Sequence, residues 1–393
     1  MTDTMPGETP DRTSKLRSNV RQALDAAWVD IGYAAPNTDV YPWLWLWDSC
    51  FHSLIWLRLG EEERALQEVT VALSSIDEAG FVAHMGYQLD PQRAVELWGR
   101  AGASSITQPP MFGHTLAELH RAGVELSASL LADATRAFRY LLHGRRRVDG
   151  LVSVVHPWET GCDDSPRWDD YCPGVGFDLT VWRAHKVALI DSIERGLHGE
   201  PLHNPAFSVA SAGFNALVAW NAAELAGVTG DGALADDAAA LAVALDEQFD
   251  DQLGTWVDAG PGRSGRARTA DGLLGLLTTR DAEIRRRATA ELVDPDAHAS
   301  RFGPRGVHAG EATYNPSTYW RGPVWPQLAY LLWLALDRSG DADVAAELRS
   351  RTIDGAIESG LAEYWNGDSG QGLGAIPQSW TGLVMVLDDG SSA

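Results

Sequence analysis

The sequence predicts an all-α protein built as a single (α/α)6 toroid, a ring of helical hairpins with its catalytic loops at one end. Apolar residues recur at helical spacing along the whole chain, and the alternation typical of strands appears only near 151–155 and 255–257. The segments without periodicity carry the Trp, Gly, Pro and acidic residues. This division is expected of a helical scaffold whose loops hold the chemistry.

We count twelve helical segments, one of them broken into a pair, and twelve helices make six hairpins. Consecutive antiparallel helices joined by short turns pack as hairpins, and six hairpins can close into a ring. No change in composition marks a domain boundary, so we expect a disordered lead-in at 1–14 and one domain over 15–393. The expected helices span 16–29, 49–59, 62–75, 112–122, 127–142, 179–196, 207–226, 234–249, the broken segment 270–292, 323–338, 342–359 and 378–387.

Charge and composition exclude several classes of partner. The formal net charge of -23 repels nucleic acid and anionic membrane surfaces. Apolar stretches fall short of the roughly 20 residues that a membrane-spanning helix needs, and the N-terminus lacks the pattern of a signal peptide. The three cysteines lack the paired spacing of a zinc site or a disulfide framework. We therefore expect a cytoplasmic protein that binds neither nucleic acid nor membrane.

Tryptophan is unusually abundant, with 16 Trp against 9 Phe and 9 Tyr. The indole ring offers a flat apolar face and one polar N–H group, which suits a site that holds sugar rings. The alternative is a hydrophobic core rich in tryptophan.

The first loop with chemical content spans 41–52, where an aromatic run reaches Asp48 at the expected start of a helix. Asp is a favoured N-cap residue, so Asp48 could cap that helix. It could also accept hydrogen bonds from sugar hydroxyls beside Trp43 and Trp45. The two roles are compatible.

The second loop, 156–170, packs five acids, one Arg and two Trp into fifteen residues. Neighbouring negative charges and an apolar wall both raise the pKa of a carboxyl group, so one of these acids could stay protonated near neutral pH, as a general acid must. The alternatives are a solvated acidic loop or a calcium site. Calcium would require regularly alternating acidic ligands, which this segment lacks.

Two later loops complete the set. The segment 314–326 combines aromatic faces with Arg321, a donor of several hydrogen bonds, and Pro323, which fits the first turn of a helix. In the segment 360–374, Glu363 lies between a helix end and a Gly-rich loop, and the glycines permit tight turns that let Glu363 point into a cleft.

Together these segments resemble glycoside hydrolase family 63, in particular its short bacterial branch of mannosylglycerate and glucosylglycerate hydrolases. The resemblance covers nearly the whole chain, in matching order and spacing. It is carried by YPWLWLWDSCFH at 41–52, ITQPP at 106–110, HPWETGCDDSPRWD at 156–169, YNPSTYWRGPVWP at 314–326 and GLAEYWNGDSGQGLG at 360–374.

The resemblance implies that Asp163 is the general acid and Glu363 the general base of an inverting reaction that needs no metal and no cofactor. Glu159 is the alternative acid. The family usually has Asn after the acid, whereas this chain has Asp164, and a second carboxylate there would raise the pKa of the pair. The expected substrate-binding residues are Trp43, Trp45, Asp48, Gln108, Trp158, Glu159, Arg167, Tyr319, Trp320, Arg321, Gln378 and Trp380.

The expected partner is a small α-glucoside or α-mannoside, with glucosylglycerate and mannosylglycerate as examples. Glucose and mannose differ only at the 2-hydroxyl, so one loop side chain could choose between them. A glycerate group is negatively charged and needs local donors or cations, for which Tyr87, Tyr319, Arg321 and Gln378 are candidates.

Two other functions fit parts of the pattern. A sugar epimerase or lyase on a similar toroid would use histidines as acid and base, and His52, His84, His114 and His156 lie in or near the loops. A non-catalytic carbohydrate-binding protein would explain the tryptophans but not the acids.

Overall fold

The computed structural model describes residues 12–172, 174, 176–262 and 264–387. Of the expected disordered lead-in, residues 1–11 lie outside the described residues. Residues 12–14 form the start of helix α1 (Arg12–Ala27), so the prediction of disorder is wrong for them.

The described chain is rich in helix, as predicted, and each predicted helical segment contains one. The α-helices after α1 are α2 (Leu46–Leu59), α3 (Glu62–Leu73), α4 (Val95–Trp98), α5 (Phe112–Arg121), α6 (Ala128–Arg139), α7 (Leu179–Leu189), α8 (Ala212–Thr229), α9 (Gly232–Asp246), α10 (Ala282–Val293), α11 (Pro326–Ser339), α12 (Ala342–Glu358) and α13 (Val384–Leu387). Among the described helices, none is both long and apolar enough to cross a membrane.

Short helical turns and two-stranded antiparallel ribbons connect these helices. The turns are η1 (Pro91–Ala94), η2 (Tyr140–Gly144), η3 (Pro157–Thr160), η4 (Pro166–Tyr171), η5 (Ile190–Ser192), η6 (Ser264–Arg266), η7 (Ala270–Leu277) and η8 (Ser379–Leu383). The ribbons pair β1 (Trp28–Val29) with β2 (Tyr33–Ala34), β3 (Leu44–Trp45) with β4 (Met85–Gly86), β5 (Arg147–Val148) with β6 (Leu151–Val152), β7 (Glu194–Arg195) with β8 (Pro201–His203), β9 (Phe249–Asp250) with β10 (Thr255–Trp256), β11 (Ala299–Ser300) with β12 (Gly303–Pro304), and β13 (Tyr364–Trp365) with β14 (Gly372–Leu373).

Several predicted helix starts differ from the structure: α1 and α2 begin three or four residues earlier than predicted, and the starts of α8, α11 and the last segment lie later. Helix α8 begins at Ala212 because the hydroxyl of Ser211 accepts the Phe214 N–H at 3.3 Å. Helix α11 begins at Pro326, so Pro323 lies before the helix. The last segment, predicted from 378, is the tighter turn η8 followed by the short α13.

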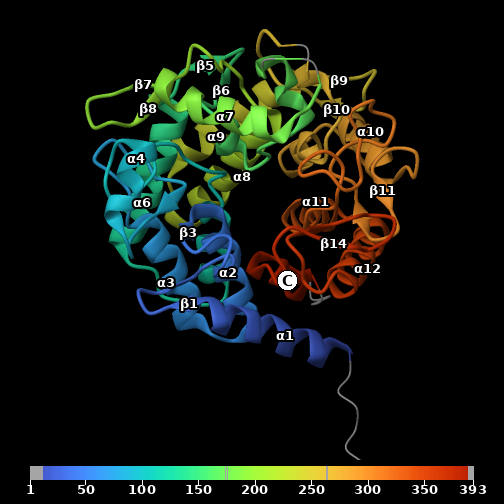
Figure 1. The fold of residues 1–393 in the computed structure, drawn as a ribbon, viewed down its shortest axis with the longest axis horizontal. Helices are drawn as coiled ribbons and strands as arrows, with labels where there is room; N and C mark the ends of the chain where they lie inside the picture. Colours follow the sequence, from blue (N-terminus) through green and yellow to red (C-terminus); the bar gives the residue numbers. More distant parts are fainter. Residues whose placement is uncertain (1–11, 173, 175, 263, 388–393) are drawn as a thin grey trace, which may run out of the picture.

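The helices follow one another around a ring, which Figure 1 shows in the order of its colours. The inner elements are α2, α5, α8, η7, α11 and η8, and each of them contacts the next. The last inner element, η8, returns to contact α2, so the set of contacts closes on itself. Helices α3, α6, α10 and α12 lie on the outside of the ring (Figure 1).

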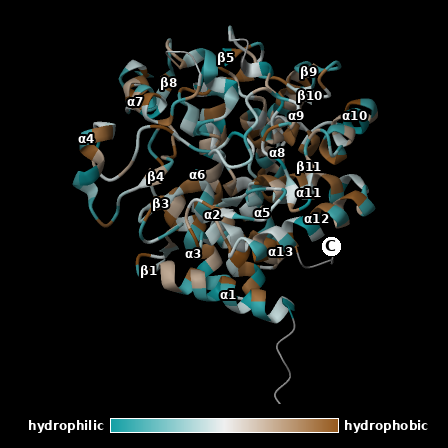
Figure 2. Ribbon diagram, turned by 45° about the vertical axis from the view of Figure 1, so that its right-hand side comes forward, coloured by the Kyte–Doolittle hydropathy of each residue, from teal (hydrophilic) through white to brown (hydrophobic). Residues whose placement is uncertain are grey.

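Burial differs between the inner and outer helices in the way their sequences dictate. Inner helix α8 buries thirteen of its eighteen residues, whereas outer helix α10 buries only Ala288 and Leu292. A helix that is apolar on all sides must be enclosed, and one with a single apolar stripe lies at the surface. Helix α1 is of the second kind, with hydrophobic and hydrophilic residues along its length (Figure 2).

Inner helices α5 and α8 approach closely at Gly113. A Cβ atom at this glycine would overlap the carbonyl oxygen of Asn221. The side chain of Asn221 meanwhile accepts the backbone N–H of His114 at 2.7 Å, which satisfies a donor in the first turn of α5. Both contacts require the backbones to stay at their present separation.

We expect Gly113→Ala to lower the free energy of unfolding by about 1 to 3 kcal/mol, because the added methyl group must push α5 away from α8. Gly227→Ala is the matched control, since Gly227 lies in α8 with open space around it. That change should raise stability by about 0.5 to 1 kcal/mol through helix propensity. Urea denaturation followed by circular dichroism measures both, and equal stability of the two variants would contradict the packing argument.

Candidate active site

The loops that the sequence singled out meet where inner elements of the ring begin. The backbone N–H of Trp47 donates to Oε1 of Gln108 at 3.3 Å, which joins the first loop to 106–110. The Tyr41 hydroxyl donates to Oε1 of Glu363 at 3.1 Å, which joins the first loop to the last. Nη1 of Arg321 donates to the carbonyl oxygen of Asp164 at 3.1 Å, which joins the third loop to the second.

Glu363 is a buried carboxylate with both oxygens held. Oε1 accepts the Tyr41 hydroxyl, and Oε2 accepts the Ala375 N–H at 3.0 Å. Gly374 makes this geometry possible, because its φ is +72° and a Cβ atom there would overlap the Glu363 carboxylate. Burial raises the pKa of Glu363 to about 7, against the lowering effect of these two hydrogen bonds.

Asp163 lies in the second loop and is coupled to Glu363. Burial raises the pKa of Asp163 to about 8, the charge of Lys186 lowers it, and the charges of Asp164, Glu363 and Asp48 raise it further. Asp163 is therefore the weaker acid of the two. Burial raises the pKa of the Tyr41 hydroxyl, and the charges of Glu363 and Asp163 both act on Tyr41 and raise this pKa further.

Asp48 is a third buried acid, in the first turn of α2, and it is not the N-cap. The helix begins at Leu46, whose N–H donates to the carbonyl oxygen of His84 at 2.9 Å, while Gln108 takes the N–H of Trp47. The capping interpretation of Asp48 is therefore wrong, because other loops satisfy the start of the helix. Burial raises the pKa of Asp48 to about 7.

The predicted aromatic residues surround these acids in two groups. Trp43, Trp45, Trp158 and Tyr319 are partly exposed. Trp320 and Trp380 are buried. The abundant tryptophans therefore lie both in the candidate site and in the protein interior, since most of the others, such as Trp56, belong to the hydrophobic core.

The two buried rings support the site from behind. Nε1 of Trp380 donates to the backbone oxygen of Glu363 at 3.1 Å, which fixes the peptide that carries this carboxylate. Trp320 stacks on Trp325 with ring centres 3.6 Å apart. The backbone of Trp320 has a φ of +57°, a left-handed conformation that a bulky residue adopts only when its surroundings enforce it.

Several predicted site residues carry a buried polar atom that has no hydrogen-bond partner among the described residues. These atoms include Nε1 of Trp45, Nε1 of Trp320 and Oε1 of Gln378. Buried polar groups in proteins are almost always paired, so unpaired ones in a site point to a polar ligand. Two donors and one acceptor are suited to sugar hydroxyl groups.

Glu159, the alternative acid, is fully occupied by the protein. Its carboxylate forms a buried ion pair with Arg145 and accepts the backbone N–H groups of Thr107 at 3.1 Å and Val155 at 2.8 Å. The side chains of Glu159 and Arg145 are both completely buried. The structure therefore contradicts Glu159 as a sugar contact or proton donor and makes it the link between two loops.

Arg167 is likewise structural. Its guanidinium group is buried and pairs with Asp258 at 2.7 Å and Asp271 at 3.1 Å. The expectation that it binds sugar is wrong, because its charge is already compensated inside the scaffold. Arg321 also has an acidic partner, with bidentate bonds of 2.9 and 2.6 Å to Asp169.

Sequence reasoning missed two residues of the site. Tyr41 stands at the start of the first loop, and its contact with Glu363 joins segments from opposite ends of the chain. Lys186 lies on the buried face of α7 with Trp182 and Leu189, and it pairs with Asp164 at 2.6 Å. A lysine at helical spacing from these two apolar residues was the available signal.

The four histidines considered as acid or base are buried and engaged with protein groups. His52 lies 2.6 Å from the Ser379 hydroxyl, His84 lies 2.6 Å from the Ser104 hydroxyl, and Nε2 of His156 donates to the Lys186 carbonyl at 2.8 Å. Burial lowers the pKa of His156 to about 3 and also lowers that of His84 and His114, so these rings stay neutral. The arrangement does not favour histidine-based epimerisation or elimination.

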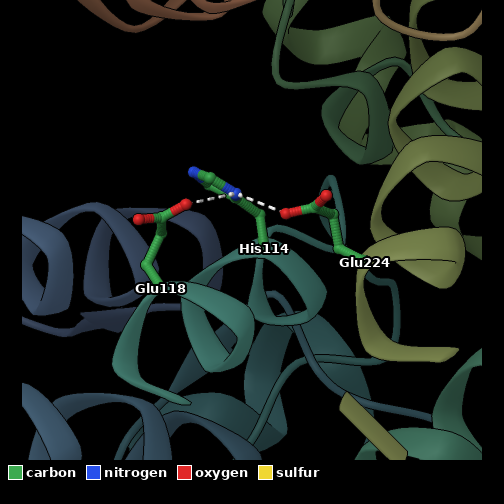
Figure 3. A group of neighbouring side chains, drawn as sticks. All are labelled: His114, Glu118 and Glu224. Carbon is green, nitrogen blue, oxygen red and sulfur yellow. Dashed lines mark hydrogen bonds and ion pairs between the residues drawn. The ribbon is translucent and has the colours of Figure 1, made fainter. Parts of the chain in front are cut away.

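One group in the described part of the chain has the spacing of metal ligands, namely His114, Glu118 and Glu224 (Figure 3). Nδ1 of His114 lies 3.3 Å from Glu224 and 3.7 Å from Glu118. Arg121 and Arg338 each pair with both glutamates. Because two guanidinium groups already neutralise the carboxylates, we interpret this group as a polar link between α5, α8 and α11.

Solved structures with the same fold include enzymes of one glycosidase family. The structure of a GH63 mannosylglycerate hydrolase from Thermus thermophilus, in complex with Tris and D-glycerate, is 24% identical and has a TM-score of 0.85. The match covers 95% of this chain and 99% of that one. A structure of the same enzyme in complex with glucose is 25% identical, with a TM-score of 0.80.

Sequence relatives agree with the structures. A mannosylglycerate hydrolase of Thermus thermophilus is 26% identical over 90% of this chain and 96% of its own length. A glucosylglycerate hydrolase of Mycolicibacterium hassiacum is 28% identical over 89% of this chain and 92% of its own. The model of the mannosylglycerate hydrolase MGH1-like glycoside hydrolase domain matches residues 41–381. The resemblance to family 63 is confirmed: the chain belongs to this family, and the protein is a glycoside hydrolase.

Proposed function

We propose that the protein is an inverting hydrolase of a small α-glucoside or α-mannoside, with glucosylglycerate or mannosylglycerate as its substrate. The observation that carries this proposal is the placement of Asp163 and Glu363 around Tyr41, which bonds Glu363 at 3.1 Å and is acted on by the charges of both carboxylates. Burial raises the pKa of Asp163 to about 8 and that of Glu363 to about 7. Asp163 therefore keeps its proton over a pH range in which Glu363 has begun to lose its own.

The two carboxyl groups take opposite roles in the reaction. Protonated Asp163 donates to the glycosidic oxygen, while ionised Glu363 deprotonates a water that attacks the anomeric carbon from the other face. Tyr41 and the Ala375 N–H hold the Glu363 oxygens in a fixed orientation. In inverting enzymes the two carboxyl groups stand roughly 6.5 to 9.5 Å apart, which leaves room for the water.

The relatives and the site together support a glycerate conjugate. The named activities of the two sequence relatives are a mannosylglycerate and a glucosylglycerate hydrolase, so either sugar fits the family. The partly exposed faces of Trp43, Trp45 and Trp158 suit a sugar ring. The unpartnered atoms of Trp45, Trp320 and Gln378 suit its hydroxyl groups.

The scaffold that we propose is a single-domain (α/α)6 toroid over residues 15–393. Six inner elements in a closed cycle of contacts support it. So do the pairs α2 with α3, α8 with α9, and α11 with α12, in which neighbouring helices pack on each other. The catalytic loops precede inner elements and bond to one another, which supports their location at one end of the ring.

Asp163→Asn and Glu363→Gln should each lower turnover by about 100-fold to 10,000-fold, because they remove the proton donor and the base while keeping the shape of the side chain. Asp170→Asn and Glu358→Gln are the matched controls, since both acids are exposed; Asp170 lies in the same loop as Asp163, and Glu358 ends α12, five residues before Glu363. Those controls should keep turnover near that of the unmodified protein. Kinetics on both glycerate conjugates provide the measurement.

The same kinetics include Glu159→Gln as a third variant. We expect it to lower stability, because the charge of Arg145 would stay buried without its partner. Near-normal turnover in Asp163→Asn, together with loss of turnover in a folded Glu159→Gln protein, would contradict the assignment of the acid.

We expect a plot of kcat/KM against pH to be a narrow bell with its maximum between about pH 7 and pH 8. Its acidic side is called the lower limb and its alkaline side the upper limb. Glu363 must be ionised, so activity rises as the pH passes about 7, and Asp163 must be protonated, so activity falls as the pH passes about 8. Asp48 has a pKa of about 7 as well, so Asp48→Asn tests the origin of the lower limb. If that limb disappears in Asp48→Asn, its assignment to Glu363 is wrong.

The configuration of the released sugar tests the mechanism directly. A single displacement by water inverts the anomeric centre, so an α-linked substrate should release the β-sugar first. Proton NMR during the first minutes, before mutarotation, distinguishes the anomers and shows whether glucosylglycerate or mannosylglycerate is consumed. Initial release of the α-sugar would instead require a covalent intermediate and carboxyl groups only about 5 to 5.5 Å apart.

A further inference from the structure

Lys186 is a buried cation in contact with the loop that carries the proposed acid. Its side chain is 4% exposed, and Nζ lies 2.6 Å from Oδ1 of Asp164 and 3.4 Å from the backbone oxygen of Asp163. The ammonium group also lies 5.6 Å from the ring centre of Trp158. The side chain of Lys186 therefore touches the acid loop at the acid itself and at the residue that follows it.

The backbone of Lys186 is bound to the other end of the same loop. Nε2 of His156 donates to the Lys186 carbonyl at 2.8 Å, and Nδ1 of His156 accepts the N–H of Trp158 at 3.1 Å. The segment from 156 to 164 is thus attached to one residue of α7 at both of its ends. Elsewhere α7 is mostly exposed, with Trp182 and Leu189 as its other buried residues.

Stability alone gives no reason for an ion pair, instead of two apolar residues, at positions 164 and 186. A buried ion pair is often no more stable than a well-packed apolar pair of similar size, because both charges lose their hydration. Replacing Lys186 alone, however, would leave the Asp164 carboxylate buried without its partner. The use of a charge points to a role at the acid.

We propose that Lys186 is a positioning residue for the general acid, which anchors the peptide of Asp163 and balances the charge of Asp164 beside it. This inference rests on the proposed function, in which Asp163 protonates the leaving group. Without Lys186, Asp164 would place an uncompensated negative charge next to the acid. With Lys186, the two charges largely cancel at Asp163.

The electrostatic surroundings of Asp163 make this balance measurable. Lys186 lowers its pKa, and Asp164 raises it by less. Other charged groups also act on this pair of acids: Asp48 of α2 and Glu363 after α12 act on Asp163, and Asp169 and Arg321 act on Asp164. Burial raises the pKa of Tyr41, Tyr319 and Cys162, and the charge of Asp163 in turn raises it further. All of these residues stay in place when Lys186 or Asp164 is replaced, so shifts of the upper pH limb in opposite directions in the two variants report the balance of that pair.

The test measures pH profiles of kcat/KM for Lys186→Met, Asp164→Asn and the double variant, each in the whole chain. Lys186→Met should lower kcat/KM about tenfold or more and move the upper limb to higher pH, because the cation that favours ionised Asp163 is gone. Asp164→Asn should move that limb to lower pH. In the double variant the upper limb should return close to its position in the unmodified protein. Lys186→Arg keeps the positive charge, so its kcat/KM and its upper limb should lie closer to those of the unmodified protein than those of Lys186→Met do.

Arg183→Met is the matched control, since it removes an exposed cation from the same helix. It should leave both the rate and the limb unchanged. A second substrate tests the link to the acid: a glycosyl fluoride of the same sugar has a good leaving group and needs less proton donation. Lys186→Met should therefore lose at least about fivefold less activity on the fluoride than on the glycerate conjugate.

Three results would overturn the inference. Limbs that move in the same direction in Lys186→Met and Asp164→Asn, or that do not move, would show a merely structural contact. Equal losses on the fluoride and the glycerate conjugate would show the same. Near-normal turnover of Asp163→Asn would overturn the proposed function and this inference with it, whereas loss of turnover there beside unmoved limbs overturns only the inference. If Lys186→Met does not fold, Asp164→Asn and Lys186→Arg still decide the outcome.

Discussion

The ion pair between Glu159 and Arg145 is the interaction on which the acid side of the site depends. The Glu159 carboxylate holds the backbone of Thr107 in one loop and of Val155 in another, while Arg145 anchors it to the chain that follows α6. Two ions can be buried only when nearly all of their hydrogen-bonding capacity is used. Here four bonds to one carboxylate meet that requirement, and Asp163 follows only four residues after Glu159 in the sequence.

Local patterns in the sequence are sufficient to predict most of the fold. Helical periodicity gives every major helix within a few residues, because an apolar face must repeat at helical spacing wherever a helix is packed. The start of α2 could not be predicted, because the acceptors of its first backbone N–H groups, His84 and Gln108, come from other loops. The closure of the ring by η8 against α2 is equally a contact between distant segments.

The site residues likewise fall into those that sequence motifs predict and those that only contacts between distant segments define. Asp163, Glu363 and the tryptophans stand in recognisable motifs, so their presence near the chemistry could be predicted. The roles of Glu159 and Arg167 could not, because a charged residue in a motif looks the same whether it faces a ligand or a buried partner. Arg145, Asp258 and Asp271 lie outside every motif, and only the fold brings them to those side chains. The pairing of Lys186 with Asp164 could not be predicted either, because it exists only once α7 is packed against the second loop.

The closure of the ring by the C-terminal segment has a consequence for the order of synthesis. A ribosome makes α2 early, but the turn that completes its inner neighbourhood, η8, emerges only after residue 378. Until then the nascent chain carries five inner elements with an open apolar edge between α2 and α11, the kind of surface on which chaperones act. Glu363 emerges in the same late stretch. A chain that ends before residue 363 would therefore lack both the proposed base and the segment that closes the ring.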